Sequence, residues 1–307
     1  MKIFFAPMQG FTDFVYRNLF KEFFLGVEKF FTPFLRVENS QVRKKDIIDI
    51  EKSDNYQNTI PQLIANSKDE VEIIAQEILK LGFENCDINF GCPFPQQTFK
   101  KRGAGILTFP DKVAEVLKAT EKIPELKFSI KMRLGNLDKN ECLNLVDIIN
   151  DTKLEFVTIH PRISKQMYNG EIQLEMFSKL STLIQHPIVY NGDLKTKEDI
   201  QNITTQFPNI KAVMIGRGLL ADPFLAQNFE SDKNGFDAKI YLNFFNRLIE
   251  GYLAEYQNSE VMALNKIKTF LSFAPSKIST KHVKTIQKAR SISQFISQLA
   301  VALNSTT

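Results

Sequence analysis

Short apolar runs alternate with amphipathic stretches along the first 230 residues or so of the chain. The apolar runs predict buried strands, and the amphipathic stretches predict helices with one face turned to the core. Strands are predicted at 3–8, 29–34, 59–65, 86–90, 127–134, 156–161, 187–191 and 211–216. Helices are predicted at 14–24, 69–82, 111–123, 139–151, 175–184 and 197–206, with a short one opened by Asp222-Pro223. Residues 35–58 are polar and predict a loop with a short helix.

Strict alternation of strand and helix with short connections predicts a parallel sheet, because each helical crossover returns the chain to the same direction. Eight such units that close on themselves form a (β/α)8 TIM barrel, and the length of this part of the chain suits that fold. A doubly wound sheet is the second possibility. No strand here ends in the GxGxxG pattern typical of many such folds, so we favour the barrel.

The last part of the chain shows a different pattern. Three long helical patterns follow at 238–256, 260–273 and 281–303, with no strand pattern between them. They predict a small all-α helical bundle. The polar stretch 231–235 separates it from the barrel, so we expect a catalytic domain at 1–235 and a helical domain at 236–307.

The composition is that of an ordinary globular protein, with 43% hydrophobic and 24% charged residues. No apolar run approaches the roughly 18 residues that span a bilayer. The N-terminal apolar run is too short for a signal peptide, so we expect a cytoplasmic protein without a membrane segment. The cysteines are Cys86, Cys92 and Cys142, without a CxxC pair, and the three histidines are scattered. No zinc site or other metal site is predicted.

Positive charge is concentrated in the helical tail. Residues 238–307 contain nine Lys and Arg against three Asp and Glu, whereas the whole chain has a net charge of +4. A basic segment attached to a nearly neutral body suggests a polyanionic partner. A solvated helical face in a lysine-rich protein would produce the same excess, and we give the two interpretations equal weight.

Polar and reactive residues follow most of the predicted strands. In a parallel barrel the carboxyl ends of the strands form the active face, so these side chains should meet at one mouth. The strand ends, in chain order, carry Pro7, Met8 and Gln9, then Gln62, Asn89 and Cys92, Lys131 and Arg133, His160 and Arg162, Asn191-Gly192-Asp193, and Gly216-Arg217-Gly218.

Cys92 lies where a buried strand is stopped by Gly91-Cys92-Pro93. Gly91 permits unusual backbone angles and Pro93 cannot donate to a sheet, so the strand must end there and the thiol is placed at the barrel mouth. A buried, inert cysteine that fills a gap is the alternative. Polar groups at most of the other strand ends favour a chemical role.

The loops after the last two strands suggest a phosphate site. Loops at this place in barrels often bind phosphate through backbone N–H groups that glycine leaves unobstructed. Asn191-Gly192-Asp193 and Gly216-Arg217-Gly218 fit this role, and Arg217 can pair with an anion. A ligand anchored there would place its body over the barrel axis, near Lys131. Flavin mononucleotide (FMN) has this shape, and Lys131 would stabilise negative charge on its ring.

Seven segments of the chain, in their order and spacing, resemble the tRNA-dihydrouridine synthases. They are APMQGFTDFVYR (6–17), DINFGCP (87–93), RGAGIL (102–107), KMRLG (131–135), HPRISKQMYNGE (160–171), YNGD (190–193) and MIGRG (214–218). The helical tail resembles the RNA-binding domain of that family. The segment PFLRV (33–37) is most similar to the bacterial branch that acts at position 16 of the tRNA D-loop.

The resemblance implies an FMN-dependent enzyme, driven by NADPH or NADH, that reduces a uridine in the D-loop of tRNA to 5,6-dihydrouridine. Flavin N5 would deliver a hydride to uracil C6, and Cys92 would protonate C5. Asn89, Tyr168 and Arg36 would contact the substrate. The implied FMN-binding residues are Pro7, Met8, Gln9, Gln62, Lys131, His160, Asn191, Gly192, Asp193, Gly216 and Arg217. A monomer is expected.

Two other functions are compatible with parts of the sequence. An FMN barrel that reduces a small molecule, of the dihydroorotate or enoate type, would explain the barrel mouth but not the basic tail. Deletion of residues 237–307 should leave its turnover intact. A tRNA-binding protein that keeps a flavin for structure would explain the tail, but it would not require Cys92, Lys131 and His160.

Overall fold

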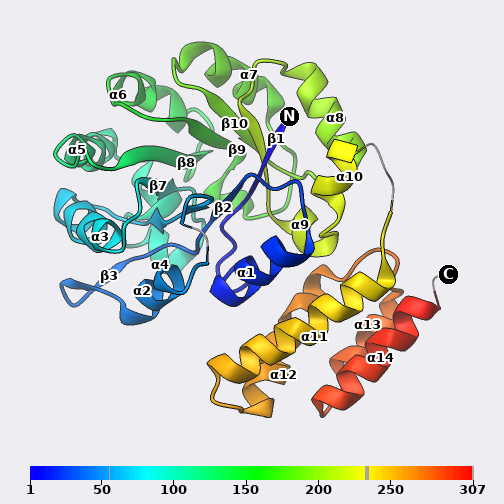
Figure 1. The fold of residues 1–307 in the computed structure, drawn as a ribbon. Coiled ribbons are helices and arrows are strands. Elements are labelled where there is room, and N and C mark those ends of the chain that lie inside the picture. Colours follow the sequence, from blue (N-terminus) through cyan, green and yellow to red (C-terminus); the bar gives the residue numbers. More distant parts are fainter. Residues whose placement is uncertain (55, 232–234, 306–307) are drawn as a thin grey trace.

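Parallel strands form a barrel with eight crossings of its wall in the computed structural model (Figure 1). Nine strands make these crossings, because β5 and β6 together form one of them. The structure describes residues 1–54, 56–231 and 235–305. The sheet order is β5-β2-β1-β11-β10-β9-β8-β7-β6. Its strands are β1 (Lys2–Phe5), β2 (Lys29–Phe31), β5 (Thr59–Ile60), β6 (Gln62–Leu63), β7 (Asn85–Phe90), β8 (Lys127–Gly135), β9 (Val157–Ile163), β10 (Ile188–Asn191) and β11 (Ala212–Ile215).

The barrel closes at Pro61. The predicted strand 59–65 is present as β5 and β6, on either side of this proline. β5 pairs with β2 and β6 pairs with β7, so the two ends of the sheet order belong to one crossing of the barrel wall. Pro61 has no N–H to donate, but its carbonyl accepts a hydrogen bond from the backbone N–H of Asp87 at 2.9 Å. The predicted (β/α)8 barrel is therefore confirmed.

Helices surround the strands on the outside of the barrel (Figure 1). They are α1 (Phe14–Phe23), α3 (Lys68–Lys80), α5 (Pro110–Thr120), α6 (Val146–Asn150), α7 (Leu174–Leu183), α8 (Lys197–Gln206), α9 (Arg217–Ala221) and α10 (Leu225–Ser231). The prediction of one helix at 139–151 was wrong in part, because Glu141–Leu145 forms a 3-10 turn before α6. The connection from β2 to β5 holds the hairpin β3 (Val37–Glu38) and β4 (Gln41–Val42), followed by α2 (Lys44–Glu51).

Apolar and polar residues divide the interior of the barrel between them. Phe4, Phe31 and Phe156 pack together with ring centroids 5.7–6.3 Å apart. On other strands, Gln62, Asp87 and Ser129 share one register, and all three are buried. The aromatic cluster fills the space between the strands, whereas the polar row leads toward the carboxyl ends, where the predicted site residues lie.

The tail is helical, as predicted, but it contains four helices and not three in its described part, 235–305. These are α11 (Ala238–Glu255), α12 (Glu260–Thr269), α13 (Thr280–Gln287) and α14 (Ile292–Asn304). The predicted helix 281–303 is interrupted at 288–291, where the Ser291 side chain accepts from the N–H of Gln294 and starts α14. The predicted domain boundary includes 232–234, which lie outside the described residues.

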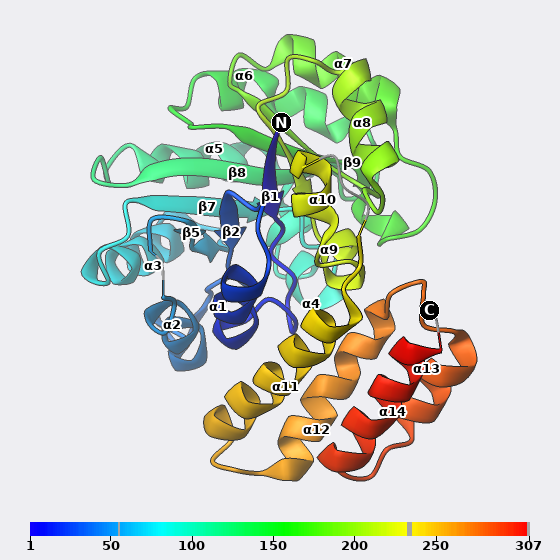
Figure 2. The same ribbon diagram turned by 45° about the vertical axis from the view of Figure 1, so that its right-hand side comes forward.

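The C-terminal helices lie directly against α1 (Figure 2). The ring of Tyr16 stacks on that of Phe270 with centroids 5.1 Å apart, and Phe24 meets Phe244 at 4.9 Å. The ammonium of Lys266 lies 2.7 Å from Asp13 Oδ2, at the start of α1. Barrel and tail therefore share an apolar contact, and the Lys266–Asp13 ion pair adds a polar contact between them.

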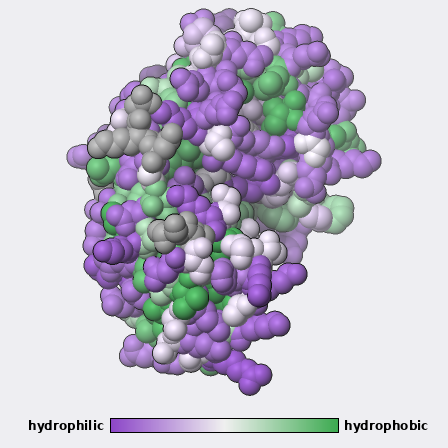
Figure 3. Space-filling model, turned by 90° about the vertical axis from the view of Figure 1, so that its right-hand side faces the viewer, coloured by the Kyte–Doolittle hydropathy of each residue, from purple (hydrophilic) through white to green (hydrophobic). Residues whose placement is uncertain are grey.

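The outer surface is mixed in character. Hydrophilic residues cover most of the face on the side of the C-terminal helices, and hydrophobic residues form separate small patches there (Figure 3). In the part of the chain that the structure describes, no helix combines the length and hydropathy needed to cross a membrane.

Candidate active site

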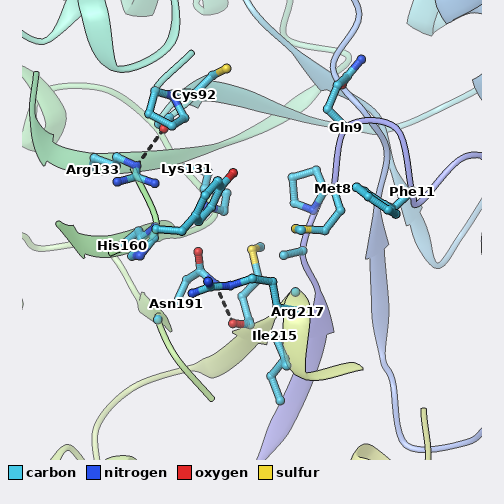
Figure 4. Close-up of a pocket in the computed structure, with 18 of the residues that line it drawn as sticks. Met8, Gln9, Phe11, Cys92, Lys131, Arg133, His160, Asn191, Ile215 and Arg217 are labelled. Carbon is cyan, nitrogen blue, oxygen red and sulfur yellow. Dashed lines mark hydrogen bonds between the residues drawn. The ribbon is translucent and has the colours of Figure 1, made fainter. Parts of the chain in front are cut away.

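A pocket opens at the carboxyl ends of the barrel strands and collects the residues singled out in the sequence. Figure 4 shows Cys92, Lys131 and His160 on one side of it and Met8 and Phe11 on the other. Except for Arg36, every predicted site residue lines it: Pro7, Met8, Gln9, Gln62, Asn89, Cys92, Lys131, His160, Tyr168, Asn191, Gly192, Asp193, Gly216 and Arg217. Arg36 instead pairs with Glu38 at 2.7 Å, outside the pocket wall.

Cys92 is fixed by a turn that begins at the end of β7. The side-chain oxygen of Asn89 accepts hydrogen bonds from the backbone N–H groups of Gly91 at 3.0 Å and Cys92 at 2.8 Å. Gly103, with φ of +59°, packs directly against Cys92 in this turn. A Cβ at this glycine would lie 2.7 Å from Cys92 Cβ. Only glycine therefore fits at position 103, both for its backbone angle and for the space beneath the thiol.

A row of buried hydrogen bonds orients Asn89. Its amide nitrogen donates to Gln62 Oε1 at 2.7 Å, and Gln62 Nε2 donates to Asp87 Oδ2 at 2.7 Å. The Ser129 hydroxyl donates to the other oxygen of Asp87 at 2.6 Å. A carboxylate only accepts hydrogen bonds, so Asp87 determines which way the Gln62 amide points, and Gln62 in turn determines the orientation of Asn89. Burial raises the pKa of Asp87 to about 6, which leaves it ionised at neutral pH.

The Cys92 thiol is buried, at 7% exposure, in an apolar cluster with Phe34 and Ile64. Burial raises the pKa of the Cys92 thiol above its ordinary value, and the charges of Arg133, Lys131 and Arg36 oppose this shift. The thiol therefore carries its proton at neutral pH. The same cations stabilise the thiolate that remains once the proton has been given away. Arg133 is held in place by donating to the carbonyl of Gly91 at 3.1 Å and to that of Ile163 at 2.9 Å.

Lys131 and His160 give the pocket wall two different polar groups. Burial lowers the pKa of the Lys131 ammonium to about 8, so it is charged at pH 7. Its ammonium donates to no acceptor in the described residues. Burial, reinforced by Arg133 and Lys131, lowers the pKa of His160 well below its usual value, so the imidazole is neutral. An unpartnered ammonium in a pocket calls for a ligand that offers an acceptor or a negative charge.

The loops after β10 and β11 touch each other. A Cβ at Gly218 would lie 2.1 Å from the carbonyl oxygen of Leu194, so the loops meet backbone to backbone. Within the described residues, the N–H groups of Gly192, Leu194 and Gly218 donate no hydrogen bond. Asp193 bridges Arg162 and Arg217, and the Arg217 contact measures 2.7 Å. One carboxylate between two guanidinium groups leaves a net positive charge. Free N–H donors beside such a charge suit a phosphate.

Tyr168 lies between two guanidinium groups in the pocket. Its ring centroid is 5.4 Å from Arg133 Cζ and 5.1 Å from Arg217 Cζ, distances typical of cation–π contacts. Its loop is tied down by Arg162, which donates to the carbonyl of Gly170 and also pairs with Asp193. The connection after β9 is thus linked to the loop after β10.

The tail contributes one wall residue, Phe273, to the same pocket. Its ring packs edge-to-face on Phe11 with centroids 4.9 Å apart. Phe11 follows Met8 and Gln9 in the loop after β1 and also lines the pocket. The C-terminal helices are therefore part of the site and not only attached beside it.

Sequence reasoning missed several members of this site. Asp87 and Phe273 were not predicted to act there, and Arg162 was placed at the mouth without a specific role. Arg162 stands at a strand end, so its position gave a signal. The only sequence signal for Asp87 was that a charged residue stands within an otherwise apolar strand. Nothing in the local pattern marked Phe273. Among the described residues, no three side chains of the metal-binding types gather into one cluster.

Comparison with known proteins gives one consistent family. The family described as "Dihydrouridine synthase (Dus)" matches residues 4–299. A protein of Pasteurella multocida named tRNA-dihydrouridine synthase B is 29% identical over 75% of this chain and 69% of its own length. A tRNA-dihydrouridine(16) synthase of Neisseria meningitidis is 28% identical over 78% of this chain and 74% of its own.

Two further similarities agree with the fold. A probable tRNA-dihydrouridine synthase of Staphylococcus aureus is 26% identical over 86% of this chain and 81% of its own. Among solved structures, a morphinone reductase mutant in complex with tetrahydroNAD aligns with a TM-score of 0.53. That alignment covers 78% of this chain and 90% of the other, at 9% identity, and therefore supports the barrel fold alone.

Proposed function

The chain belongs to the dihydrouridine synthase family, and we propose that it reduces a uridine in the D-loop of tRNA to 5,6-dihydrouridine. One observation carries the proposal for this chain in particular. The Cys92 thiol, protonated and held by Asn89, lines the same pocket as two abutting loops with free N–H groups and an unpartnered lysine. A proton donor and an anchoring site for a phosphate-bearing cofactor thus meet at one barrel mouth.

The residues present fit FMN as cofactor. The loops at Gly192–Leu194 and Gly216–Gly218, with Arg217, would hold its phosphate. Lys131 would stabilise negative charge on the ring, and the neutral imidazole of His160 would lie beside it. Pro7, Met8, Gln9, Gln62 and Asn191 would complete the site from the other walls. FMN held by these residues and reduced by NADPH or NADH would supply the hydride for C6 of the uracil.

Cys92 would supply the proton to C5. A general acid must hold its proton at neutral pH, and the burial of this thiol ensures that it does. Once the S–H bond breaks and the C–H bond forms, a thiolate is left. Arg133 and Lys131 face that charge and make the transfer less costly. The turn held by Asn89 fixes the sulfur, so the proton is delivered from one defined direction.

The uracil would be bound by Asn89 and Tyr168. The Asn89 amide has two N–H bonds and uses one on Gln62, which leaves the second for a uracil carbonyl. Tyr168 offers an aromatic ring whose position is set by Arg133 and Arg217. Because the pocket lies inside the barrel mouth, the uridine must leave its stack in the RNA to reach it. Arg36, near the mouth but outside the pocket wall, would contact the RNA around the uridine.

We assign catalysis to residues 1–235 and tRNA binding chiefly to 236–307, whose basic excess suits a polyanion. A cytoplasmic monomer is the form we expect. The family membership favours this function over a small-molecule reductase and over a non-catalytic flavoprotein. The relatives of nearly equal identity include synthase B and a position-16 enzyme, so sequence identity does not select the target uridine.

The test is to incubate the FMN-loaded protein and NADPH with tRNA transcribed without modifications. We expect one nucleoside to gain two hydrogens, detected by mass spectrometry of nuclease digests, and mapping of the fragment to locate it in the D-loop. NADH in place of NADPH measures the preference for the reductant. Absence of dihydrouridine with a full set of unmodified tRNAs would overturn the proposed function.

A further inference from the structure

The exposed phenylalanines of this protein are confined to one short segment. The chain contains 27 phenylalanines, and nearly all of them are packed inside or partly covered. The exposed ones are Phe94, Phe99 and Phe109, at 42%, 86% and 37% exposure. All three lie in the segment that directly follows Cys92. Phe99 is the most exposed large apolar side chain among the described residues.

This segment is held rigidly and is not a loose loop. Phe99 follows the short helix α4 (Pro95–Thr98). The carbonyl of Lys100 accepts from the Asn66 side chain at 2.7 Å, and Arg102 is buried in an ion pair with Glu70. The N–H of Ala104 donates to the carbonyl of Cys92 at 3.0 Å. The backbone on both sides of Phe99 is fixed, so its ring is presented outward at a defined place.

The charge of the segment points to the chemistry of its partner. Residues 91–110 contain Lys100, Lys101 and Arg102 and no acidic residue. Arg102 is neutralised by Glu70, whereas the ammonium groups of Lys100 and Lys101 meet no carboxylate in the part of the chain that the structure describes. The Lys101 ammonium lies over the Phe109 ring, 4.4 Å from its centroid. Exposed aromatic rings interleaved with free lysines are the pattern of single-stranded nucleic-acid binding.

The segment stands at the rim of the active-site pocket. Phe94 lines that pocket, two residues after Cys92. Phe273 of the tail lines the same pocket, so the rim at Phe94 and the C-terminal helices border one opening. A polynucleotide laid across the mouth would therefore meet this rim and the basic tail together.

We propose that Phe99 stacks on a nucleotide next to the target uridine, while Lys100 and Lys101 bind the neighbouring phosphates. The proposal rests on the proposed function, because it takes tRNA as the substrate. It adds a second contact of defined position, on the barrel itself. An unstacked uridine leaves its neighbour with one bare face, and an aromatic ring on the rim can cover that face.

The test uses the lack of tryptophan in the chain. Phe99→Trp places a single tryptophan on the rim, and Leu183→Trp places one at an exposed position at the end of α7, which leads into the amino end of β10. Both proteins are loaded with FMN and titrated with unmodified tRNA, with correction for RNA absorbance. We expect quenching of the Phe99→Trp emission and protection from acrylamide. The emission of Leu183→Trp should not change.

Phe99→Ala supplies the second measurement. We expect its dissociation constant for tRNA to rise roughly tenfold, the order of loss of one stacked base, and KM for tRNA to rise with it. Reduction of bound FMN by NADPH is measured in parallel, so that damage to the cofactor site is recognised. Unchanged emission of Phe99→Trp at saturating tRNA, or wild-type affinity of Phe99→Ala, would overturn the proposal.

Other outcomes separate this proposal from the proposed function. If the wild-type protein neither binds nor reduces tRNA, the proposed function fails, and the rim proposal falls with it. If wild-type protein reduces tRNA while the Phe99 variants behave like it, only the rim proposal is overturned. An emission change in Phe99→Trp that follows protein concentration without RNA would show a contact between protein copies and would also overturn it.

Discussion

The backbone N–H of Cys92 donates to the side-chain oxygen of Asn89 at 2.8 Å, at the point where β7 ends. One N–H of the Asn89 amide donates to Gln62 Oε1, and Gln62 Nε2 in turn donates to Asp87. The position of the thiol is therefore set by a row of hydrogen bonds that starts inside the barrel.

Asn89→Ala should slow tRNA reduction at least tenfold. The change leaves the N–H groups of Gly91 and Cys92 and the side-chain oxygen of Gln62 without a partner, at a cost of about 1–3 kcal/mol for each buried group. Reduction of FMN by NADPH should be affected less, because Asn89 acts through the position of Cys92. Stopped-flow measurement of each half-reaction separates the two effects. Asn89→Asp keeps the acceptor oxygens and should retain more activity than the alanine variant; the reverse order would contradict the assigned role.

Gly103→Ala should be far more harmful than Gly82→Ala. Both glycines have positive φ, so both substitutions carry backbone strain of about 1–2 kcal/mol. A Cβ at Gly103 would also lie 2.7 Å from Cys92 Cβ, whereas a Cβ at Gly82 meets nothing within 4 Å. The difference between the variants in Tm and in the rate of tRNA reduction therefore measures the displacement of Cys92. Equal Tm values and equal rates of tRNA reduction in the two variants would show that the backbone at position 103 can move away from Cys92 without loss, and would contradict the prediction.

FMN affinity should fall as the pH rises through about 8. The Lys131 ammonium is charged below its lowered pKa of about 8 and neutral above it, so its attraction for the flavin ring is lost at higher pH. By linkage, FMN binding above this pH should take up a proton. Titration of flavin fluorescence on both sides of this pH checks the expectation. Lys131→Met should bind FMN more weakly at neutral pH, and its FMN affinity should not fall as the pH passes about 8. If the FMN affinity of this variant falls with pH as in the wild type, the titrating group is not Lys131.

Deletion of residues 237–307 should yield a protein that aggregates. It would uncover Tyr16 and Phe24, which pack on Phe270 and Phe244, and remove Phe273 from the pocket. Such a deletion does not separate the proposed functions in the way the sequence suggested, since barrel and tail share an apolar contact. Phe273→Ala is the milder change and should weaken FMN binding with little loss of Tm. A soluble truncated barrel with full FMN affinity would contradict this picture.

The fold was predictable because its signals are local. Apolar runs that end in Gly or Pro marked the strands and placed Cys92, Asn191 and Arg217 at one face of a barrel. The division of the third strand at Pro61 depends on pairing with β2 and β7, which the sequence does not display. The interruption between α13 and α14 was missed because apolar positions such as Ile286 and Ala289 continue the helical pattern up to Ser291.

The site was predictable to the extent that its residues stand at strand ends. Arg36 pairs with Glu38 of the hairpin β3–β4 and lies outside the pocket wall, so its predicted contact with the substrate stays a prediction. The orienting role of Asp87 depends on Gln62 and Ser129 in neighbouring strands, and register is not visible in one sequence. Phe273 reaches Phe11 only through the packing of the tail on α1.

The most direct test is a single-turnover reaction of the FMN-loaded protein, reduced by NADPH without oxygen and then mixed with unmodified tRNA. We predict that the flavin spectrum of the wild-type protein returns and that one dihydrouridine forms for each flavin oxidised. Cys92→Ala should accept electrons from NADPH normally, but its oxidation by tRNA should be about 100-fold slower or more, as expected for loss of a general acid. Oxidation of Cys92→Ala by tRNA at the wild-type rate would contradict the role of Cys92, and a wild-type flavin that tRNA never oxidises would contradict the proposed function itself.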